Sequence, residues 1–235
     1  MKNNGLVILS GGQDSTTTAL FARLECKELH GVTFNYGQKH KIEINSAIKI
    51  AKLLNFKSHE VINIKNTLKS TSPIINRKKK ITKYNSKTEM TKGIEPTFIP
   101  SRNILFLTIA SNRAILRNCK TIYTGVCEED YGGYPDCRKI FIDSIEKSLN
   151  LGIFGKKKVI KIKTPLMKLT KKESVKIAIK KCKNMKEFNK IFSETHTCYD
   201  GKKGGCRKCH ACILRDIGFK QAKIIDPILV FRKNV

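Results

Sequence analysis

Residues 10–15, with the sequence SGGQDS, have types and spacing that could bind a phosphate group. They follow the apolar run 6–9, which predicts a buried strand, and precede a helix-compatible stretch, 15–27. The two glycines let backbone N–H groups converge on one point, and Asp14 and Ser15 are good N-cap residues. Free N–H groups and the dipole of a helix N-terminus favour anions, so the segment predicts a phosphate-binding turn. The alternative is a well-capped turn from strand to helix that binds nothing.

Four cysteines near the C-terminus have the spacing C-x7-C-x2-C-x2-C. A C-x-x-C turn places two thiolates a few ångströms apart, which suits a tetrahedral metal ion. Four thiolates leave no open coordination position, so the pattern predicts one closed structural zinc site at Cys198, Cys206, Cys209 and Cys212. An iron–sulfur cluster and a reactive cysteine pair are the alternatives. His196 is a fifth candidate ligand, which a four-thiolate site does not need.

Length and composition limit the class of protein. The 235 residues, 40% of them hydrophobic, suit one α/β domain with a small appendage. No apolar run is long enough for a membrane span, and no signal peptide is recognisable, so we expect a cytoplasmic protein without a membrane partner. Nine cysteines in such a protein argue for metal or thiol chemistry over disulfides.

The net charge of +28 would ordinarily indicate a nucleic-acid partner. Here the lysines are scattered through nearly every segment of the chain. A compositional bias explains that distribution as well as RNA binding does. We therefore predict no functional nucleic-acid site.

Apolar periodicity predicts five strands that alternate with helices. The expected strands are 6–9, 28–34, 58–64, 121–126 and 159–164, and the expected helices are 15–27, 41–55, 104–117, 138–150 and 171–181. This order predicts an α/β fold, a Rossmann-like parallel five-stranded sheet with helices on both faces. Residues 65–96 are predicted to form a long loop with a helical turn. We divide the chain into an α/β domain, 1–190, and a small C-terminal zinc-binding module, 191–235.

The SGGxDS turn resembles the pyrophosphate loop of ATP pyrophosphatases, and the whole chain resembles the 7-cyano-7-deazaguanine synthase family. The resemblance runs through SGGQDSTT at 10–17, FNYGQKH at 34–40, GYPDCR at 133–138, TPLMKLTK at 164–171 and ETHTCYDG at 194–201. Ser101 and Thr18 depart from the family pattern, which has Gly and often Cys there. Serine tolerates a positive φ less well than glycine, so we expect a local backbone difference at Ser101.

The resemblance implies a ligase that converts 7-carboxy-7-deazaguanine and ammonia to the nitrile. The carboxylate would form an acyl adenylate with ATP, ammonia would give the amide, and a second adenylation would give the nitrile. AMP and pyrophosphate would be released, and Mg²⁺ would assist. The partners would be the free deazapurine and ammonia, and the sequence leaves open whether the chain forms a homodimer.

Residue roles follow from this resemblance. ATP would contact Leu9, Ser10, Gly11, Gly12, Gln13, Asp14, Ser15, Thr16, Thr17, Thr18 and Ala19. The residues expected to carry the chemistry are Ser10, Asp14, Ser15, Arg102, Asp136 and Arg138. Among them, Arg102 would neutralise phosphate, Asp136 would accept N–H groups of a guanine-like edge, and Arg138 would pair with the substrate carboxylate. Tyr36 or Tyr134 would stack on a base.

Two other functions are compatible with parts of the sequence. A tRNA-modifying relative, a thiolase or a lysidine-type ligase, would use the same loop but act on RNA, with catalytic cysteines in place of a closed metal site. A zinc-knuckle protein that only binds RNA is the third function, and the intact SGGQDS turn argues against it.

Overall fold

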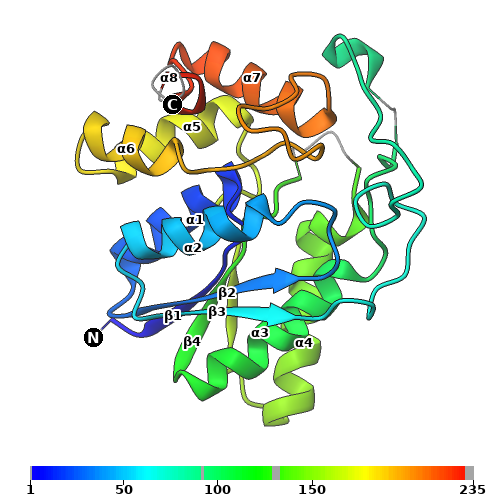
Figure 1. The fold of residues 1–235 in the computed structure, drawn as a ribbon. Coiled ribbons are helices and arrows are strands. Elements are labelled where there is room, and N and C mark those ends of the chain that lie inside the picture. Colours follow the sequence, from blue (N-terminus) through cyan, green and yellow to red (C-terminus); the bar gives the residue numbers. More distant parts are fainter. Residues whose placement is uncertain (1, 91–92, 129–132, 231–235) are drawn as a thin grey trace.

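The fold is a parallel sheet with helices on both faces (Figure 1). The computed structural model describes residues 2–90, 93–128 and 133–230. Its sheet has the order β3-β2-β1-β4-β5, and every neighbouring pair is parallel. The strands are β1 (Asn4–Ile8), β2 (Leu29–Asn35), β3 (Ser58–Asn63), β4 (Cys119–Tyr123) and β5 (Lys161–Lys163). The predicted fold class is confirmed.

Two hydrophobic clusters lie on opposite faces of the sheet because successive side chains of a strand point to opposite sides. Leu6 packs with apolar residues of α3 (Arg102–Leu116) and α4 (Lys139–Phe154). Val7, its neighbour in β1, packs in the other cluster with residues of α1 (Gln13–Glu25) and α2 (Ile42–Leu53). Both side chains are almost fully buried.

The C-terminal helices form a further layer over α1 and α2, as Figure 1 shows. They are α5 (Lys171–Lys181), α6 (Met185–Phe192), α7 (His210–Ala222) and α8 (Pro227–Val230). The rings of Phe188, Phe192 and Phe219 contact one another and join α6 to α7. These three phenylalanines belong to the same cluster as Val7, so the segment that follows residue 190 shares a core with the sheet. The predicted domain boundary at 190 stays a prediction.

Three local expectations were wrong. The predicted helix 15–27 begins earlier, at Gln13, and its N-cap is Gly12, so Asp14 and Ser15 lie in the first helical turn. Ser101 has φ 64°, the left-handed conformation that favours glycine, so the serine does not shift the backbone before α3 out of that conformation. No helix was predicted after 181, whereas the structure has α6, α7 and α8 there.

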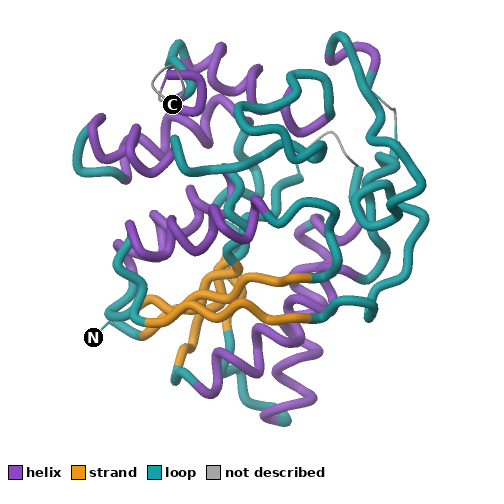
Figure 2. Tube along the Cα trace, in the orientation of Figure 1, coloured by secondary structure: helices purple, strands orange, loops and turns teal. Residues whose placement is uncertain are grey.

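The loop predicted at 65–96 is present, with a single 3₁₀ turn at Lys87–Glu89 in its described part. Figure 2 shows this and other loops gathered beyond the carboxyl ends of β2 and β3. The strand order reverses between β1 and β4, and in open parallel sheets ligands bind at the carboxyl ends of such a switch point. Among the described helices, none is long and apolar enough to cross a membrane.

Candidate functional site

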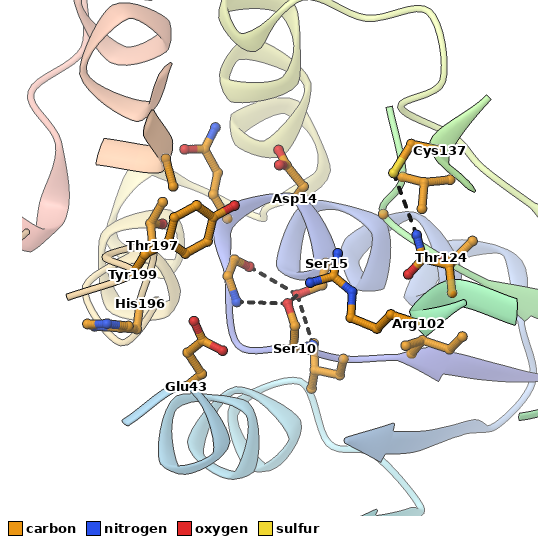
Figure 3. Close-up of a pocket in the computed structure, with 18 of the residues that line it drawn as sticks. Ser10, Asp14, Ser15, Glu43, Arg102, Thr124, Cys137, His196, Thr197 and Tyr199 are labelled. Atoms are coloured by element: carbon orange, nitrogen blue, oxygen red, sulfur yellow. Dashed lines mark hydrogen bonds between the residues drawn. The ribbon is translucent and has the colours of Figure 1, made fainter. Parts of the chain in front are cut away.

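A cavity of about 280 Å³ lies at the carboxyl ends of β1, β2 and β4. Its lining comes from the turn after β1, the ends of β2 and β4, and the start of α3. Residues of the segment 196–199 and of α7 complete it. Figure 3 shows how these separate parts of the chain point their side chains into one space. The switch point of the sheet therefore carries a cavity.

The turn Ser10–Ser15, called the phosphate loop below, depends on glycine at position 11. Gly11 has φ +81°, and a Cβ there would lie 2.3 Å from the Glu43 carbonyl oxygen. The Ser15 hydroxyl donates to the Gly12 carbonyl oxygen at 3.1 Å, and the Ser10 amide donates to the Ser15 hydroxyl at 3.2 Å. These bonds fix the loop at the N-terminus of α1, where backbone N–H groups lack helical partners.

Asp14 is held by Lys171, the first residue of α5. The Lys171 ammonium donates to Asp14 Oδ2 at 2.7 Å. Asp14 Oδ1 is buried and has no hydrogen-bond partner within the described residues. Asp14 therefore offers one oxygen for a ligand.

The turn after β4 packs directly on the start of α1, because a Cβ on Gly125 would lie 2.9 Å from the Ser15 nitrogen.

The segment Thr195–Thr197 lies over the phosphate loop and is fixed from both sides. The His196 amide donates to the Gly11 carbonyl oxygen at 2.8 Å. Arg215 donates to the Thr195 and Thr197 hydroxyls, both at 2.9 Å, and forms a bidentate pair with Asp226. Arg215 is only 3% exposed, so this network is a rigid wall of the cavity.

Arg102 points into the cavity from the first position of α3 (Figure 3). Tyr36 and Tyr134 also line the cavity, close enough to Arg102 for its charge to act on both hydroxyls. Burial raises the pKa of each tyrosine to about 12, although Arg102 opposes the rise. Both hydroxyls are therefore protonated at neutral pH and can donate hydrogen bonds.

The sequence-predicted site residues divide into two groups. Those that line the cavity are Leu9, Ser10, Gly12, Gln13, Asp14, Ser15 and Arg102. Those that do not line it are Gly11, Thr16, Thr17, Thr18, Ala19, Asp136 and Arg138. The Thr16 and Thr17 hydroxyls donate to carbonyl oxygens one turn earlier in α1, which turns them away from the ligand space.

Asp136 and Arg138 both lie outside the residues that line the cavity. The Asp136 carboxylate accepts a hydrogen bond at 3.3 Å from the backbone amide of Asn103, at the start of α3. Burial raises the pKa of Asp136, and the charge of Arg102 opposes this rise. Arg138 is exposed and donates to the Glu128 carbonyl oxygen at 3.5 Å. The structure therefore does not bring these two side chains together in the cavity.

The four cysteines converge as predicted. One sulfur from each of Cys198, Cys206, Cys209 and Cys212 lies within 4.8 Å of the others. Sulfurs around a tetrahedral zinc ion lie about 3.8 Å apart, because each Zn–S bond is about 2.3 Å. Hydrogen bonds from the Cys209 and Cys212 thiols lower the pKa of Cys198. The same bonds raise the pKa of Cys209 and raise the pKa of Cys212 to about 12. A metal ion would displace the remaining thiol protons and hold four thiolates at this distance, so the cluster fits a metal ion.

Sequence reasoning missed much of the cavity lining, including three ionisable side chains close to the phosphate loop. Glu43 projects from the first turn of α2, Lys171 comes from α5, and His196 was taken only as a spare metal ligand. Lys171 ends one quoted motif and His196 lies within another, so the motifs contained a signal for both. Glu43 follows the FNYGQKH segment by three residues, and nothing in its local pattern separates it from an ordinary first-turn acidic residue.

A family model described as "Queuosine biosynthesis protein QueC" matches residues 4–223. The chain belongs to this family. A 7-cyano-7-deazaguanine synthase of Gloeobacter violaceus is 47% identical over 229 residues, 97% of each chain. One from Acetivibrio thermocellus is 38% identical, with 95% of this chain and 96% of that one covered, and one from Staphylococcus haemolyticus is 40% identical over 93% of each. These QueC-family relatives span nearly the same length as this chain and support a role in queuosine biosynthesis.

Two solved structures with a similar fold are more distant than these relatives. The NH3-dependent NAD synthetase of Campylobacter jejuni aligns at 17% identity and TM-score 0.42, covering 76% of this chain and 63% of that one. The U34-tRNA thiolase of Methanococcus maripaludis, with its [4Fe-4S] cluster, aligns at 17% identity and TM-score 0.47, covering 100% and 74%. Likenesses this low support no statement about the ligands or metal of a QueC-family chain.

Proposed function

We propose that the chain is an ATP-dependent carbon–nitrogen ligase that converts 7-carboxy-7-deazaguanine and ammonia to 7-cyano-7-deazaguanine. A carboxylate resists ammonia because its charge repels nucleophiles and oxide is a poor leaving group. Attack of the carboxylate on the α-phosphorus of ATP gives an acyl adenylate and pyrophosphate. Ammonia then displaces AMP to form the amide, and a second adenylation on the amide oxygen followed by loss of AMP leaves the nitrile. Each product molecule consumes two ATP.

One observation carries this proposal: the phosphate loop and Arg102 face the same cavity. N–H groups at the start of α1 would hold the pyrophosphate, and the Ser10 and Ser15 hydroxyls would add donors. Arg102 would neutralise charge on the α-phosphate and the adjoining carboxylate. Catalysis would rest on positioning and charge neutralisation, because adenylation needs no covalent enzyme intermediate.

The same site would hold Mg²⁺ through Asp14. Its Oδ1 atom is buried without a partner among the described residues, while Oδ2 is bonded to Lys171. A carboxylate oxygen is the ligand type that Mg²⁺ prefers, and Mg²⁺ bound with ATP would neutralise phosphate charge. For the four-cysteine cluster we propose zinc, because four thiolates close the coordination sphere and leave the metal a structural role.

The substrate ring would lie beside Tyr36 and Tyr134, whose aromatic surfaces face the cavity together with Phe34 and Phe106. Their protonated hydroxyls would donate to the substrate. Asp136 and Arg138 were predicted to bind its guanine-like edge and carboxylate, and both roles stay predictions. Two arginines line the described cavity, and Arg215 is already paired with Asp226, so we assign the carboxylate to Arg102.

The tRNA-modifying alternative is less well supported than this ligase. It needs reactive cysteines, whereas three of the four clustered cysteines are buried and all four lie within 4.8 Å of one another. A free base as substrate, a cytoplasmic location and a homodimer stay predictions.

Product analysis tests the proposal. The purified chain is given ATP, Mg²⁺, ammonium and 7-carboxy-7-deazaguanine labelled with ¹⁸O in its carboxylate. Mass spectrometry should find the nitrile, pyrophosphate and AMP that carries one ¹⁸O atom. ADP with free phosphate, or AMP without label, would contradict adenylation of the carboxylate.

Two variants then separate the two predicted arginines. Arg102→Met should lower kcat/KM by at least about 100-fold, because a charge-assisted hydrogen bond to the substrate is lost. Arg138→Met is its matched control, since the wild-type side chain is exposed and outside the cavity. An equal loss in Arg138→Met would restore the role that the sequence predicted for it.

A further inference from the structure

Glu43 is a cavity carboxylate to which the reaction scheme above gives no role. Only two carboxylates line the described cavity, and the other, Asp14, is bonded to Lys171. In the part of the chain that the structure describes, the Glu43 carboxylate has no hydrogen-bond or ion-pair partner; Arg102 acts on it only through its charge. An acidic side chain that faces a ligand cavity without a partner is available to a cationic ligand.

The chain fixes Glu43 beside the phosphate loop. A Cβ on Gly11 would lie 2.3 Å from the Glu43 carbonyl oxygen and 2.7 Å from the Ala47 nitrogen, so the first turn of α2 packs directly on the loop backbone. His196 bonds the same glycine from the other side. Figure 3 shows the Glu43 carboxylate pointing from α2 into the cavity, between the loop and the segment that carries His196.

The proposed reaction needs what such a group can supply. Near neutral pH, ammonia in water is almost entirely ammonium, which has no free electron pair and cannot attack a carbonyl carbon. The site must therefore bind a small cation next to the activated carboxylate and remove one proton from it. Neither Arg102 nor Lys171 can bind a cation, and the proposed function already gives the free Oδ1 atom of Asp14 to Mg²⁺, while Oδ2 is bonded to Lys171.

We propose that Glu43 binds the ammonium ion that supplies the nitrogen and accepts its proton. The inference rests on the proposed function and deepens it. One N–H bond of ammonium breaks and its proton moves to a Glu43 oxygen, which leaves ammonia with a free electron pair. That pair forms the C–N bond at the acyl carbon, the bond from carbon to the AMP oxygen breaks, and AMP leaves with those electrons. The nitrogen then loses one more proton to water and the amide is complete.

The electrostatics of the cavity agree with this role. Burial raises the pKa of Glu43 to about 7; the charge of Arg102 opposes the rise, and Cys198 adds to it. The other ionisable groups that face the described cavity are the Asp14–Lys171 pair, Arg215 in its pair with Asp226, Tyr36, Tyr134, Tyr199, Cys137, His196 and His210. A carboxyl group with this pKa accepts a proton readily near neutral pH.

The test separates adenylation from the ammonia step in the full-length chain. Glu43→Gln keeps the shape of the side chain and removes its charge, and Glu60→Gln is the matched control, because Glu60 pairs with Arg113 outside the cavity. In pyrophosphate–ATP exchange driven by 7-carboxy-7-deazaguanine without ammonium, Glu43→Gln should stay within about twofold of wild type. Amide formation from ammonium should fall at least about 100-fold near pH 7, the range expected when a general base is lost.

Two further readouts move only if Glu43 handles the proton. Raising the pH to about 9 should restore much of the amide formation in Glu43→Gln, because free ammonia then reaches the site without a base. Hydroxylamine, which is mostly unprotonated near neutral pH, should form the hydroxamate at nearly the wild-type rate in the variant. Glu43→Asp, which keeps the carboxylate, should retain part of the ammonium reaction.

Each other outcome overturns the inference in a recognisable way. Loss of pyrophosphate exchange in Glu43→Gln would make Glu43 a ligand of Mg²⁺ or ATP. Equal losses with ammonium and hydroxylamine would make it a packing residue, and an unchanged ammonium reaction would leave it without a role. A wild-type chain that shows no exchange with the carboxylate would overturn the proposed function itself, and this inference with it.

Discussion

The phosphate loop and the four-cysteine cluster are both compact sites, but they are held together by different means. The loop uses six consecutive residues whose own hydroxyls, amides and carbonyls bond one another around Gly11 and Gly12. The cluster takes sulfurs from Cys198 to Cys212 and places them within 4.8 Å, where ionised thiolates would repel. The loop therefore has internal hydrogen bonds that hold its shape without a ligand, whereas four thiolates in the cluster need a cation to balance their charge.

The largest effect should come from the glycine on which the loop depends. Gly11→Ala places a Cβ 2.3 Å from a backbone oxygen at φ +81°, so α2 or the loop must move. We expect the free energy of unfolding to fall by about 3 to 4 kcal/mol, measured by urea denaturation, together with loss of AMP formation.

Gly152→Ala is the matched control for that loss. Gly152 lies in α4 and a Cβ there meets nothing within 4 Å. Alanine should stabilise the helix by about 0.5 to 1 kcal/mol. A Gly11→Ala chain as stable and active as wild type would show that the loop does not need its close contact with α2.

Metal removal tests the other half of the comparison. Cys206→Ser, or a strong chelator, should release the metal and lower the free energy of unfolding by about 3 kcal/mol, because metal binding energy contributes to folding. Metal content is measured by mass spectrometry and stability by thermal denaturation. Cys182→Ser, outside the cluster, should keep full metal content. Full metal content in Cys206→Ser would contradict a four-thiolate site. Iron in place of zinc would favour the iron–sulfur alternative.

Glu43 shows that the loop region, although complete, includes one destabilising charge. Because the pKa of Glu43 is raised from 4.5 to about 7, the folded chain binds more protons than the unfolded chain between these values. The free energy of unfolding of the wild type therefore falls as pH rises through this window. Glu43→Gln should be more stable than wild type by about 1 to 2 kcal/mol at pH 8, after allowance for water in the cavity, with the difference vanishing below pH 4.5.

The measurement is urea denaturation of both chains across that pH range. Glu60→Gln repeats the removal of one carboxylate at a surface ion pair and shows what charge removal does outside the cavity. A pH-independent difference between Glu43→Gln and wild type would mean that Glu43 ionises in the folded chain as it does in the unfolded chain.

A smaller effect is expected at Ser101, which precedes Arg102. Its φ of 64° costs a serine about 1 to 2 kcal/mol, whereas glycine adopts it freely but loses more entropy on folding. Ser101→Gly should therefore raise the free energy of unfolding by about 0.5 to 1 kcal/mol at unchanged kcat/KM. A loss of stability would mean that the serine side chain makes a compensating contact.

The smallest effect concerns the charge of +28, which belongs to neither site. Turnover of the free 7-carboxy-7-deazaguanine should change by less than about twofold between 0.05 and 0.2 M salt, whereas a phosphate-dominated RNA contact would lose about 1,000-fold. Modification of purified tRNA without turnover of the free base would instead support the tRNA-modifying alternative.

The sequence by itself determined the parts of this protein that are local in the chain. Alternation of apolar runs and amphipathic stretches predicted all five strands and that they run parallel, since period and connection length are local properties. The phosphate loop and the cysteine cluster were also readable, because their residues lie within 6 and 15 positions of chain. Helix α6 was missed because it is only eight residues long, and α7 because its N-cap Cys209 and its Cys212 were interpreted only as metal ligands.

Only the tertiary structure decided which side chains share the cavity. Asp14 meets Lys171 across 157 positions, and Glu43 reaches the loop because Gly11 leaves room for α2. Asp136 and Arg138 lie outside the cavity, although both are adjacent in sequence to the cavity residue Cys137. The Asp136 carboxylate accepts a hydrogen bond from the start of α3, and the Arg138 side chain is exposed. Contacts of this kind depend on how separate elements pack, and no pattern within one segment specifies them.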